Sequence, residues 1–522
     1  MLLTLPQRNL NLIQLSTMGT RKNLTLYQRI LRARLLKLRS LKMRRMSAKN
    51  AHAKSIYNLR SEKNLNGKRF RDSPALDSID GSDSDGESDH TKEMIDQISV
   101  ELESEEIETR IEALKSLVHL LVDPSPNLKK FVLEGSCIEF LTKSLLSQEF
   151  EEKFQSAWCI TNIAAGSPDL CKKALSVLPT LNTLLSSKEM QLKKQAAWAI
   201  GNMAADSSEF RLAIKANGSV PFLLKLLDEE DVELIKTACF ALSNLSRYPN
   251  SISKQLIDLD IIKKLACLLE NDQMNRAYPE IYWIIAYLTA ETEEAGEKII
   301  HSGMMGNIVK HMLGLSAIGN QCIPIVRIVG NLTSQGDCYS DIFLNNGTFL
   351  PVLFRYLVSD IRSVQKEALW ALSNITAGQV SNVEITLDAG LLPIILPVAL
   401  EGSFDIKKEA GYVIMNILAK GPNFIPVDDI KSLIPEFLSF LNSRDYEIAE
   451  LGLQFFVAIL RHFPALTTHL ENAKFVNDLE NILVVFPDAR MHVMIKSLLD
   501  QYSDLLENPA PPTKDDIEGS EN

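Results

Sequence analysis

One pair of residues, four positions apart, recurs along the chain and constrains what it can fold into. In QAAWAIGNMAAD, Trp198 and Asn202 lie on one face of an expected helix, and Asp206 follows near its end. From Asn162 to Asn416 the successive pairs are 40, 42, 43, 44, 43 and 42 residues apart. A helical repeat of that length predicts an α-solenoid, in which each unit buries its apolar face against its neighbours. The other pairs are Trp158/Asn162, Phe240/Asn244, Trp283/Tyr287, Arg327/Asn331, Trp370/Asn374 and Tyr412/Asn416.

The repeat length and the lack of strand alternation predict an all-α fold of armadillo or HEAT type. We expect a right-handed armadillo-repeat solenoid of about ten repeats over residues 93–505. Glycine precedes an apolar helix in four repeats, as expected at a turn between helices. These glycines are Gly135, Gly218, Gly347 and Gly390.

The net charge of −11 conceals two regions of opposite charge. Residues 1–71 hold 18 Lys and Arg against one acid, Glu62, and so carry +17. The remainder carries 37 basic against 65 acidic residues, or −28. An acidic body argues against nucleic-acid binding, which depends on neutralising phosphates, and favours a basic partner. We expect a basic arm at 1–71, an acidic disordered linker at 72–92, the solenoid at 93–505 and an acidic disordered tail at 506–522.

The arm contains strong helix formers between frequent basic residues, which predicts a helix that orders on an acidic partner. A solvated basic tail or a mitochondrial presequence are the alternatives for this region. A second basic group, Lys68-Arg69-Phe70-Arg71, ends the arm, and Ser82, Ser84 and Ser88 of the linker are candidate phosphorylation sites. The basic residues that dominate the expected helix are Arg29, Arg32, Arg34, Lys37, Arg39, Lys42, Arg44 and Arg45.

The recurring pair suits the recognition of an extended basic peptide. An Asn amide both donates and accepts hydrogen bonds, so a series of them can hold a peptide main chain. Indole rings can line slots for aliphatic stems and attract the cation at the end of each stem. The alternative is that Trp fills the core and Asn bridges repeats, which the repetition in register disfavours. Carboxylates that would select Lys and Arg are Glu280, Glu367 and Glu409 before the aromatic position, and Asp206 and Asp337 after the Asn.

On these residues the chain resembles the importin-α (karyopherin-α) family of nuclear import adaptors. The resemblance includes two irregularities, Tyr287 after Trp283 and Arg327 before Asn331. It implies a concave groove with a major and a minor site for nuclear localisation signals, and further groove positions at Glu280, Trp283 and Arg327. The implied major site is Trp158, Asn162, Gly166, Gln195, Trp198, Asn202, Asp206, Asn244 and Arg247. The implied minor site is Asn331, Asp337, Glu367, Trp370, Asn374, Glu409, Tyr412 and Asn416.

The resemblance also implies partners. The arm would bind importin-β and occupy the groove when cargo is absent, although it lacks a clean cluster of four basic residues. A recycling export receptor would dock on the closing repeats, nucleoporins are further candidate partners, and the protein would shuttle between cytoplasm and nucleus. The sequence departs from the family at Phe240 and Tyr412, where Trp is usual, at Cys171, where Thr supports Asp206, and at Ala290, where an acid is usual.

Two other classes of protein compete with this interpretation. An armadillo scaffold outside transport would bind a different extended peptide, typically through a basic groove, which the acidic residues here disfavour. An enzyme is not expected, because the sequence has no phosphate-binding glycine loop, metal-ligand cluster or nucleophile–base pair. We expect no cofactor, no metal, no nucleic acid and no membrane partner, and we interpret the seven cysteines as small apolar residues.

Overall fold

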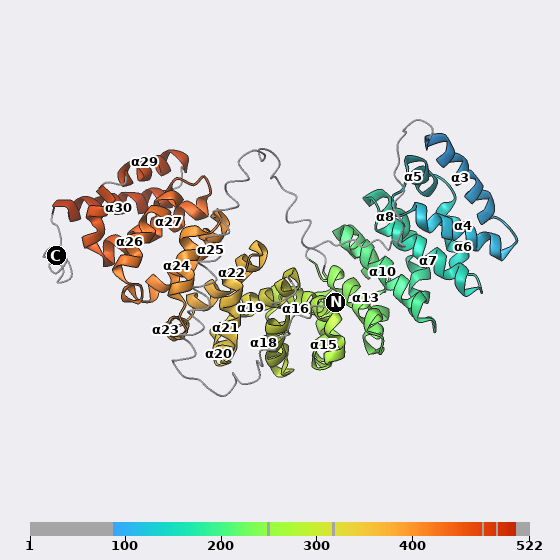
Figure 1. Cartoon of the computed structure of the whole chain (residues 1–522), viewed down its shortest axis with the longest axis horizontal. Coiled ribbons are helices and arrows are strands. Elements are labelled where there is room, and N and C mark those ends of the chain that lie inside the picture. The colour runs from blue at the N-terminus through green and yellow to red at the C-terminus, as the bar shows by residue number, and fades with distance from the viewer. Residues whose placement is uncertain (1–86, 248–250, 316–318, 472–473, 487–488, 508–522) are drawn as a thin grey trace, which may run out of the picture. The chain divides into compact units, whose positions relative to one another are not determined.

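The computed structural model describes residues 87–247, 251–315, 319–471, 474–486 and 489–507, and the regular elements in these residues are all helices (Figure 1). The predicted all-α armadillo solenoid is therefore confirmed. Residues 1–86 and 508–522 lie outside the described residues, and with them the whole basic arm, most of the linker and most of the tail. The arm residues Arg29, Arg32, Arg34, Lys37, Arg39, Lys42, Arg44 and Arg45 are among them.

The described residues form two compact units that meet at Leu332 and Thr333, within α19. In the first unit an initial helix pair is followed by repeats of three helices. Its helices are α3 (Glu87–Leu102), α4 (Ile107–Leu120), α5 (Pro126–Leu133), α6 (Cys137–Leu145), α7 (Phe150–Ala164), α8 (Pro168–Ala174), α9 (Leu178–Leu185), α10 (Met190–Asp206), α11 (Ser208–Ala216), α12 (Val220–Lys225), α13 (Val232–Leu245), α14 (Ser253–Asp258), α15 (Ile261–Glu270), α16 (Tyr278–Glu291), α17 (Glu293–His301), α18 (Met304–Leu315) and α19 (Ile323–Gln335).

The second unit continues the same arrangement. Its helices are α20 (Asp337–Leu344), α21 (Phe349–Leu357), α22 (Arg362–Ala377), α23 (Val380–Asp388), α24 (Leu392–Glu401), α25 (Phe404–Lys420), α26 (Val427–Leu441), α27 (Tyr446–His462), α28 (Thr467–Glu471), α29 (Phe475–Val485) and α30 (Ala489–Glu507). With α3–α4 and α26–α27 as reduced repeats, the two units together make ten repeats. The first helix begins at Glu87, so residues 87–92 of the expected linker are helical.

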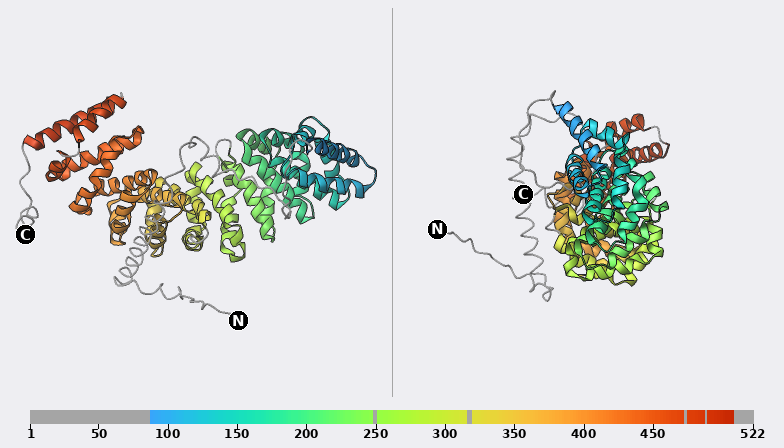
Figure 2. Two further views of the ribbon diagram at one scale, coloured as in Figure 1. Left: turned by 45° about the horizontal axis from the view of Figure 1, so that its top comes forward. Right: turned by 90° about the vertical axis from the view of Figure 1, so that its right-hand side faces the viewer.

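Within each unit the third helices of consecutive repeats pack against one another. In the first unit α10 contacts α7 and α13, and Figures 1 and 2 show these three helices in succession. Small residues allow this close packing. A Cβ on Gly201 in α10 would lie 2.6 Å from the ring of Phe240 in α13, so only glycine fits there. The side chains next to the Trp198 and Asn202 positions, such as Ala199 and Ile200, are fully buried.

The turn between the first and second helices of a repeat requires a left-handed backbone in several repeats. Gly218 and Gly390 have φ of 77° and 92°, as the sequence pattern predicted for turn glycines. Gly303 does the same, and in two other repeats Asp260 and Lys474 adopt φ of 56°. Gly135 and Gly347 also lie between first and second helices but have no positive φ. The prediction of a turn is therefore confirmed at all four glycines, and only Gly218 and Gly390 need a left-handed backbone there.

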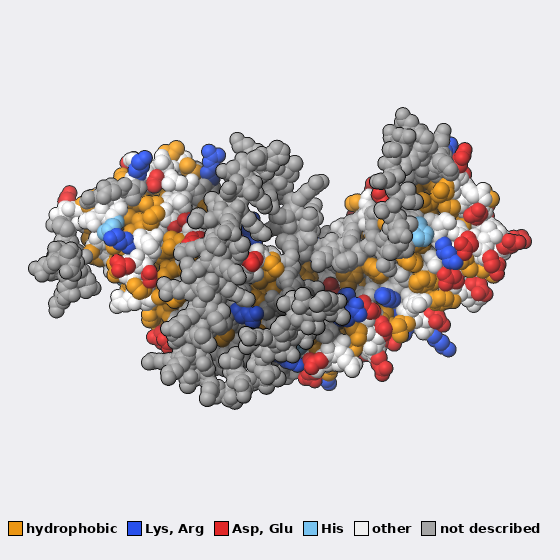
Figure 3. All heavy atoms as spheres, in the orientation of Figure 1, with side chains coloured by type: hydrophobic (Ala, Val, Ile, Leu, Met, Phe, Trp, Pro, Cys, Tyr) orange, Lys and Arg blue, Asp and Glu red, His pale blue; other side chains and the backbone are white. Residues whose placement is uncertain are grey.

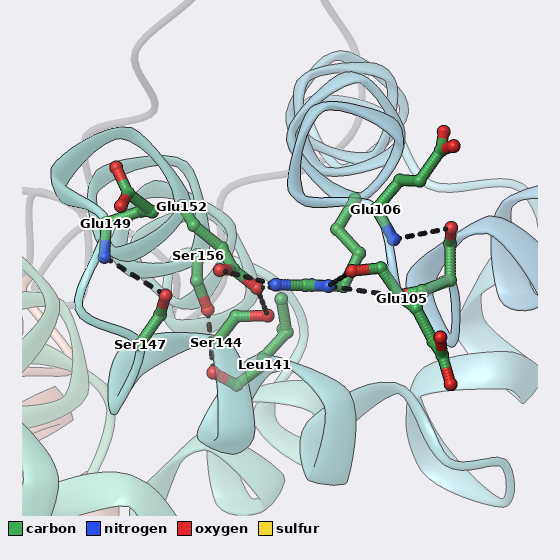
Figure 4. Close-up of polar contacts among 10 residues, drawn as sticks. Glu105, Glu106, Leu141, Ser144, Ser147, Glu149, Glu152 and Ser156 are labelled. Atoms are coloured by element: carbon green, nitrogen blue, oxygen red, sulfur yellow. Dashed lines mark hydrogen bonds and ion pairs between the residues drawn. The ribbon is translucent and has the colours of Figure 1, made fainter.

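A buried ion pair joins the first, two-helix repeat to the second repeat (Figure 4). Arg110 of α4 donates from Nε to Oε1 of Glu152 in α7 at 2.7 Å and from Nη2 to Oε2 at 3.1 Å. Ser144 donates to the same carboxylate at 3.1 Å, and the Glu152 side chain is 3% exposed. Burial alone would raise the pKa of Glu152, but the hydrogen bonds from Arg110, Ser147 and Ser144 outweigh burial and lower that pKa. The cap of the solenoid is thus fixed by charge as well as by apolar contact.

No helix in the described parts of the chain is both long and apolar enough to cross a membrane. Two sharply bent helix pairs have the length and composition, Val380–Asp388 with Leu392–Glu401 and Tyr446–His462 with Pro464–Leu470.

Candidate functional site

Within each unit the third helices place the recurring pairs in register, and we call the pairs of both units together the ladder. Within each helix the two members are one turn apart, so they share a face. The pairs of the first unit are Trp158/Asn162 on α7, Trp198/Asn202 on α10, Phe240/Asn244 on α13, Trp283/Tyr287 on α16 and Arg327/Asn331 on α19; those of the second unit are Trp370/Asn374 on α22 and Tyr412/Asn416 on α25.

The aromatic members of most pairs meet solvent. Trp158, Trp198, Trp283, Trp370 and Tyr412 are all partly exposed, whereas the residues on either side of them in the sequence are mostly buried. Phe240 is the exception, with 7% of its surface exposed. Phe240 is therefore the least exposed ring of the ladder, and the rings of Trp283 and Tyr412 already contact Arg327 and Lys408.

Four of the six asparagines are buried, and Asn374 and Asn416 are partly exposed. The amides of five of them bridge consecutive repeats. Asn202 is 0% exposed and donates from Nδ2 to the carbonyl oxygen of Thr161 at 3.2 Å. Asn244 donates to Gly201 at 3.2 Å, and Asn416 to Ser373 at 2.8 Å. The bridging role that the repetition had disfavoured is therefore present, and that part of the sequence interpretation was wrong. Asn162 bonds Val118 in the same way, and Asn331 bonds Ala286.

These bridges follow one rule of register. The acceptor is the carbonyl immediately before the preceding Asn position, as Thr161 precedes Asn162 and Gly201 precedes Asn202. The rule holds where the preceding position is not Asn, because Asn331 bonds the carbonyl before Tyr287. Applied to Asn162 and Val118, it identifies His119 of α4, which is exposed, as the corresponding position in the first repeat. The acceptor carbonyl thus keeps the same position in each repeat even where the side chain of the pair differs.

The bridge occupies only part of each amide. A carboxamide has two N–H donors and one acceptor oxygen, and the bridge uses a single donor. Oδ1 of Asn162 is buried and has no hydrogen-bond partner, and the same is true of the indole Nε1 of Trp158. At Asn162 the amide therefore links two repeats and keeps an acceptor oxygen that no hydrogen bond occupies. The two roles considered for the sequence pattern are compatible.

At α16 and α19 the ladder binds a cation from its own chain. The Cζ atom of Arg327 lies 5.6 Å from the ring centroid of Trp283, and Tyr287 stacks on Trp283 with 5.6 Å between centroids. Arg247 donates to the carbonyl of Ala205 at the end of α10, and Arg211 donates to the carbonyl of Ala204, both at 3.2 Å. The residues with predicted roles here, Arg247, Trp283 and Arg327, are thus engaged within the protein.

Arg211 was not recognised from the sequence, although it is 5% exposed. Burial lowers its pKa to about 10, and the nearby Arg247 guanidinium adds to that shift. Burial also lowers the pKa of Arg247. The two guanidinium groups bind the last carbonyls of α10, where the helix dipole is negative. Because these carbonyls belong to the two residues before Asp206, two cations and a carboxylate occur at the end of α10.

Other predicted residues of the first unit fall into two groups. Asp206, the last residue of α10, and Glu280 of α16 are partly exposed, as a carboxylate that selects cations needs to be. Gln195 and Gly166 are buried. The Gln195 Oε1 accepts a hydrogen bond from Thr161 at 2.9 Å, which adds another link between α7 and α10. Cys171, at the position where the family has Thr, is fully buried.

Acidic side chains gather along α22 and α25 in the second unit. Glu367 and Glu409 are partly exposed, each three residues before the aromatic residue of its helix. Burial raises the pKa of Glu409; Lys366 and Lys408 oppose this shift, and Glu367 adds to it. Lys408 also lies over the ring of Tyr412, with 6.0 Å between Nζ and the centroid. At Tyr412 the ladder therefore has a nearby carboxyl with a raised pKa, that of Glu409, and a cation on the ring, that of Lys408.

The predicted Asp337 lies at the start of α20, beside two residues that the sequence did not single out. A Cβ on Gly378 would clash with the Asp337 carboxylate and with the Asn382 amide, so both lie against this glycine. Asn382 is 0% exposed, and neither atom of its amide has a hydrogen-bond partner. Ser340, one turn after Asp337, also has a buried hydroxyl without a partner. No sequence pattern marks a polar side chain as unpaired.

Among the described residues, no group of three or more His, Cys, Asp and Glu is arranged to hold a metal ion. The aromatic faces, amides and carboxylates of the ladder are groups that bind a cationic chain by contact. They include no arrangement that we can assign to a reaction.

Comparison with known proteins agrees with this fold and ladder. The Armadillo/beta-catenin-like repeat family matches residues 173–205 and 207–247. A solved crystal structure of an engineered protein aligns with a TM-score of 0.66 and 25% identity, covering 78% of this chain and 99% of that one. The molecule is thus an armadillo-repeat protein with an aromatic and asparagine ladder.

Sequence relatives assign the chain to one family of armadillo-repeat proteins. Importin subunit alpha-2 of Oryza sativa subsp. japonica is 30% identical over 374 residues, which cover 68% of this chain and 70% of that protein. Importin subunit alpha-9 of Arabidopsis thaliana is 30% identical over 422 residues, which cover 76% and 80%. The chain belongs to the importin-α family, as a divergent member.

Proposed function

We propose that this protein is a nuclear import adaptor that binds the basic nuclear localisation signals of cargo proteins on its ladder. It links them to importin-β through the basic arm at 1–71. The observation that carries the proposal is the ladder itself, in which partly exposed aromatic rings alternate with buried or partly exposed amides and stand beside carboxylates. Membership of the importin-α family supports the same role.

Two segments of the ladder are assigned to the peptide. The first is on α7, α10 and α13, with the rings of Trp158 and Trp198 and the carboxylate of Asp206 as its main contacts. The second is on α20, α22 and α25, where Asp337, Glu367 and Glu409 supply charge. The other predicted contacts of the first segment are Asn162, Gly166, Gln195, Asn202, Asn244 and Arg247. Those of the second segment are Asn331, Trp370, Asn374, Tyr412 and Asn416. The further groove positions Glu280, Trp283 and Arg327 lie between the two segments in the sequence.

The magnitudes explain why a repeated surface is needed. A hydrogen bond contributes about 1 kcal/mol, and a cation over a ring about 0.5–2 kcal/mol. Micromolar binding requires about 8 kcal/mol after the cost of association. Several adjacent positions can supply this free energy and one cannot, so the ligand is a run of basic residues.

The partners and location follow from the same assignment. Cargo binds the ladder and importin-β binds the arm; a recycling export receptor binds the closing repeats, with nucleoporins as transient contacts. The protein then shuttles between cytoplasm and nucleus. A fluorescent fusion that is present in both compartments, and that accumulates in the nucleus when export is blocked, is the expected result for such an adaptor.

The decisive experiment is fluorescence anisotropy with a labelled Lys- and Arg-rich peptide and the full-length chain, over a range of salt concentrations. We expect micromolar or tighter binding that weakens with salt and disappears when the lysines of the peptide become alanine. Asp206→Lys is expected to abolish binding to the first segment. The measurement is repeated with Lys68, Arg69 and Arg71 changed to alanine, in case the arm competes. Absence of binding in both proteins would reject the adaptor function and favour an armadillo scaffold with another partner.

A further inference from the structure

Three aromatic rings form a continuous column along α7. Phe150 and Phe154 stack with 5.8 Å between centroids and 11° between planes, and Phe154 and Trp158 are also 5.8 Å apart, at 58°. The three residues are spaced four apart, so they lie on one face of the helix. All three are partly exposed. The aromatic surface at Trp158 therefore extends along α7 over the rings of Phe154 and Phe150.

The corresponding position on other helices is cationic. Four residues before the aromatic member of the ladder, α7 has Phe154, whereas four other third helices have lysine. Each of these lysines is partly or fully exposed, so this position faces solvent beside the ladder. A bound basic peptide meets a like charge there on most repeats and an apolar ring on α7. The lysines are Lys194 on α10, Lys236 on α13, Lys366 on α22 and Lys408 on α25.

Helix α25 shows what a lysine at this position does. It carries Phe404, Lys408 and Tyr412 at the positions that Phe150, Phe154 and Trp158 occupy on α7. Lys408 lies over the ring of Tyr412, with 6.0 Å between Nζ and the centroid. Phe404 is 50% exposed and packs edge-on against Phe440 of α26. The lysine interrupts the column on α25, and no column of three rings forms.

The surroundings of the α7 column are acidic. Exposed carboxylates lie on and just before α4, and Figure 3 shows acidic side chains gathered over the N-terminal repeats, where Figure 1 places α3, α4 and α6. Glu149 and Glu151 stand beside the column at the start of α7 and are exposed or partly exposed. A ligand that covers the column must therefore be apolar at one residue and basic around it. The acids near α4 are Glu103, Glu105, Glu106, Glu108 and Glu112.

We propose that the Phe150–Phe154–Trp158 column binds an aromatic side chain of the cargo peptide, located one to three residues from the end of its basic run. The inference rests on the proposed function, because the basic run must occupy the ladder. The rings of Phe154 and Trp158 are 5.8 Å apart and an extended peptide advances about 3.3 Å per residue, so an aromatic side chain at this spacing from a residue on Trp158 is within reach of Phe154. The cargo class selected by this end of the ladder is a basic signal flanked by Phe, Tyr or Trp.

The test compares three labelled peptides with the full-length protein. They share one Lys- and Arg-rich run and carry Phe before the run, Phe after it, or Ser at both places. One of the two Phe peptides is expected to bind about three- to tenfold tighter than the Ser peptide, the gain typical of an additional aromatic pair. Equal affinities of all three peptides would overturn the inference while leaving the proposed function intact. Failure of all three peptides to bind would reject both.

A variant and its matched control locate the effect. Phe154→Lys introduces the residue that four other repeats carry at this position, so the helix is expected to remain folded. It should remove the preference for Phe over Ser, and the ratio of the two affinities cancels any uniform effect of the added charge. Phe404→Ser, at the position corresponding to Phe150 on α25, should leave the ratio unchanged. A preference that persists in Phe154→Lys, with an unchanged melting temperature, would show that the column is not the binding surface.

Discussion

The guanidinium of Arg327 lies over the indole of Trp283, 5.6 Å from the ring centroid, although the two residues are on different repeats. The chain itself thus supplies a cation at the middle of the ladder. Among the described residues, no such pair is found at Trp158 or Trp198. The middle of the ladder is therefore a poorer site for a peptide lysine than the α7–α10 region.

This pair leads to a prediction about individual rings. Trp198→Ala should weaken binding of a Lys-rich peptide by about tenfold or more, since a cation–π contact contributes about 0.5–2 kcal/mol. Trp283→Ala should change it by less than threefold. Arg327→Gln should strengthen binding of a longer basic peptide by freeing the ring. Titration calorimetry of the three variants provides the comparison, and equal losses for the two Trp variants would contradict the assignment.

The amide bridges predict a cost in stability that is separate from binding. Asn202→Ala removes the donor to the Thr161 carbonyl in a fully buried place, and a lost buried hydrogen bond costs about 1–3 kcal/mol. The midpoint of urea unfolding should fall accordingly. Asn442, an exposed residue whose amide donates to Leu438 of its own helix, serves as the control, and its alanine variant should unfold like the parent. Identical midpoints for Asn202→Ala and Asn442→Ala would exclude the bridge as a stabilising contact.

The ion pair of Arg110 and Glu152 predicts a dependence of stability on pH. The pKa of Glu152 is lowered in the folded protein, so its contribution is complete above the unfolded pKa, near 4.3. It is lost as the pH falls through the folded pKa. Glu152→Gln should destabilise the first two repeats by about 1–3 kcal/mol at pH 7, because it replaces the charged acceptor of the partly buried Arg110 with a neutral one.

Thermal melts at several pH values test this prediction. The difference between Glu152→Gln and the parent should begin to shrink below about pH 4.3, where the unfolded carboxyl takes up a proton, and should be lost below the lowered pKa of the folded Glu152. A difference that stays constant down to pH 2 would mean that packing, rather than charge, is responsible.

The raised pKa of Glu409 predicts that peptide binding to the second segment weakens in mild acid. Its carboxyl takes up a proton at a higher pH than an exposed Glu, whose pKa is about 4.3, and the neutral form does not attract lysine. In the Asp206→Lys background, where the first segment is silenced, affinity should decline as the pH falls toward that raised pKa. Glu409→Gln should bind more weakly at pH 7 and show a flatter profile. An unchanged profile would assign the pH dependence to another group.

The basic arm predicts competition within the chain. A tethered segment acts at an effective concentration near millimolar, so even a weak ligand of the ladder competes with cargo. Changing Lys68, Arg69 and Arg71 to alanine should tighten cargo-peptide binding by about tenfold or more. The same variant at high salt, where charged contacts are screened, should lose most of this advantage. If cargo binds equally well to both proteins, the arm does not occupy the ladder.

The sequence was sufficient for the fold because the repeated pair, such as Trp198 and Asn202, fixes both the helix face and the period. It was not sufficient for the role of the asparagines. The Thr161 carbonyl already accepts from the N–H of Ala165 at 3.1 Å within its helix, and Asn202 uses its second lone pair. No sequence pattern shows that a helical carbonyl will accept twice.

Side-chain contacts between repeats could not be predicted from the sequence either. Arg327 and Trp283 are far apart in the sequence, and their contact depends on the stacking of α19 on α16. The contact of Lys408 with Tyr412, four residues apart on one helix, could have been predicted from helical spacing alone. The assigned roles of Asp206, Glu367 and Glu409 toward a ligand remain predictions for the experiments above.

The bridges from each asparagine to the preceding repeat span 41 residues at Asn202 and 45 at Asn331. The same contact is therefore kept across repeats of different length, because the extra residues are accommodated in the connections between helices. Insertions and deletions in those connections can accumulate during divergence without altering the geometry of the third helices. A family built in this way can lose most of its sequence identity while the spacing of its binding positions is inherited unchanged.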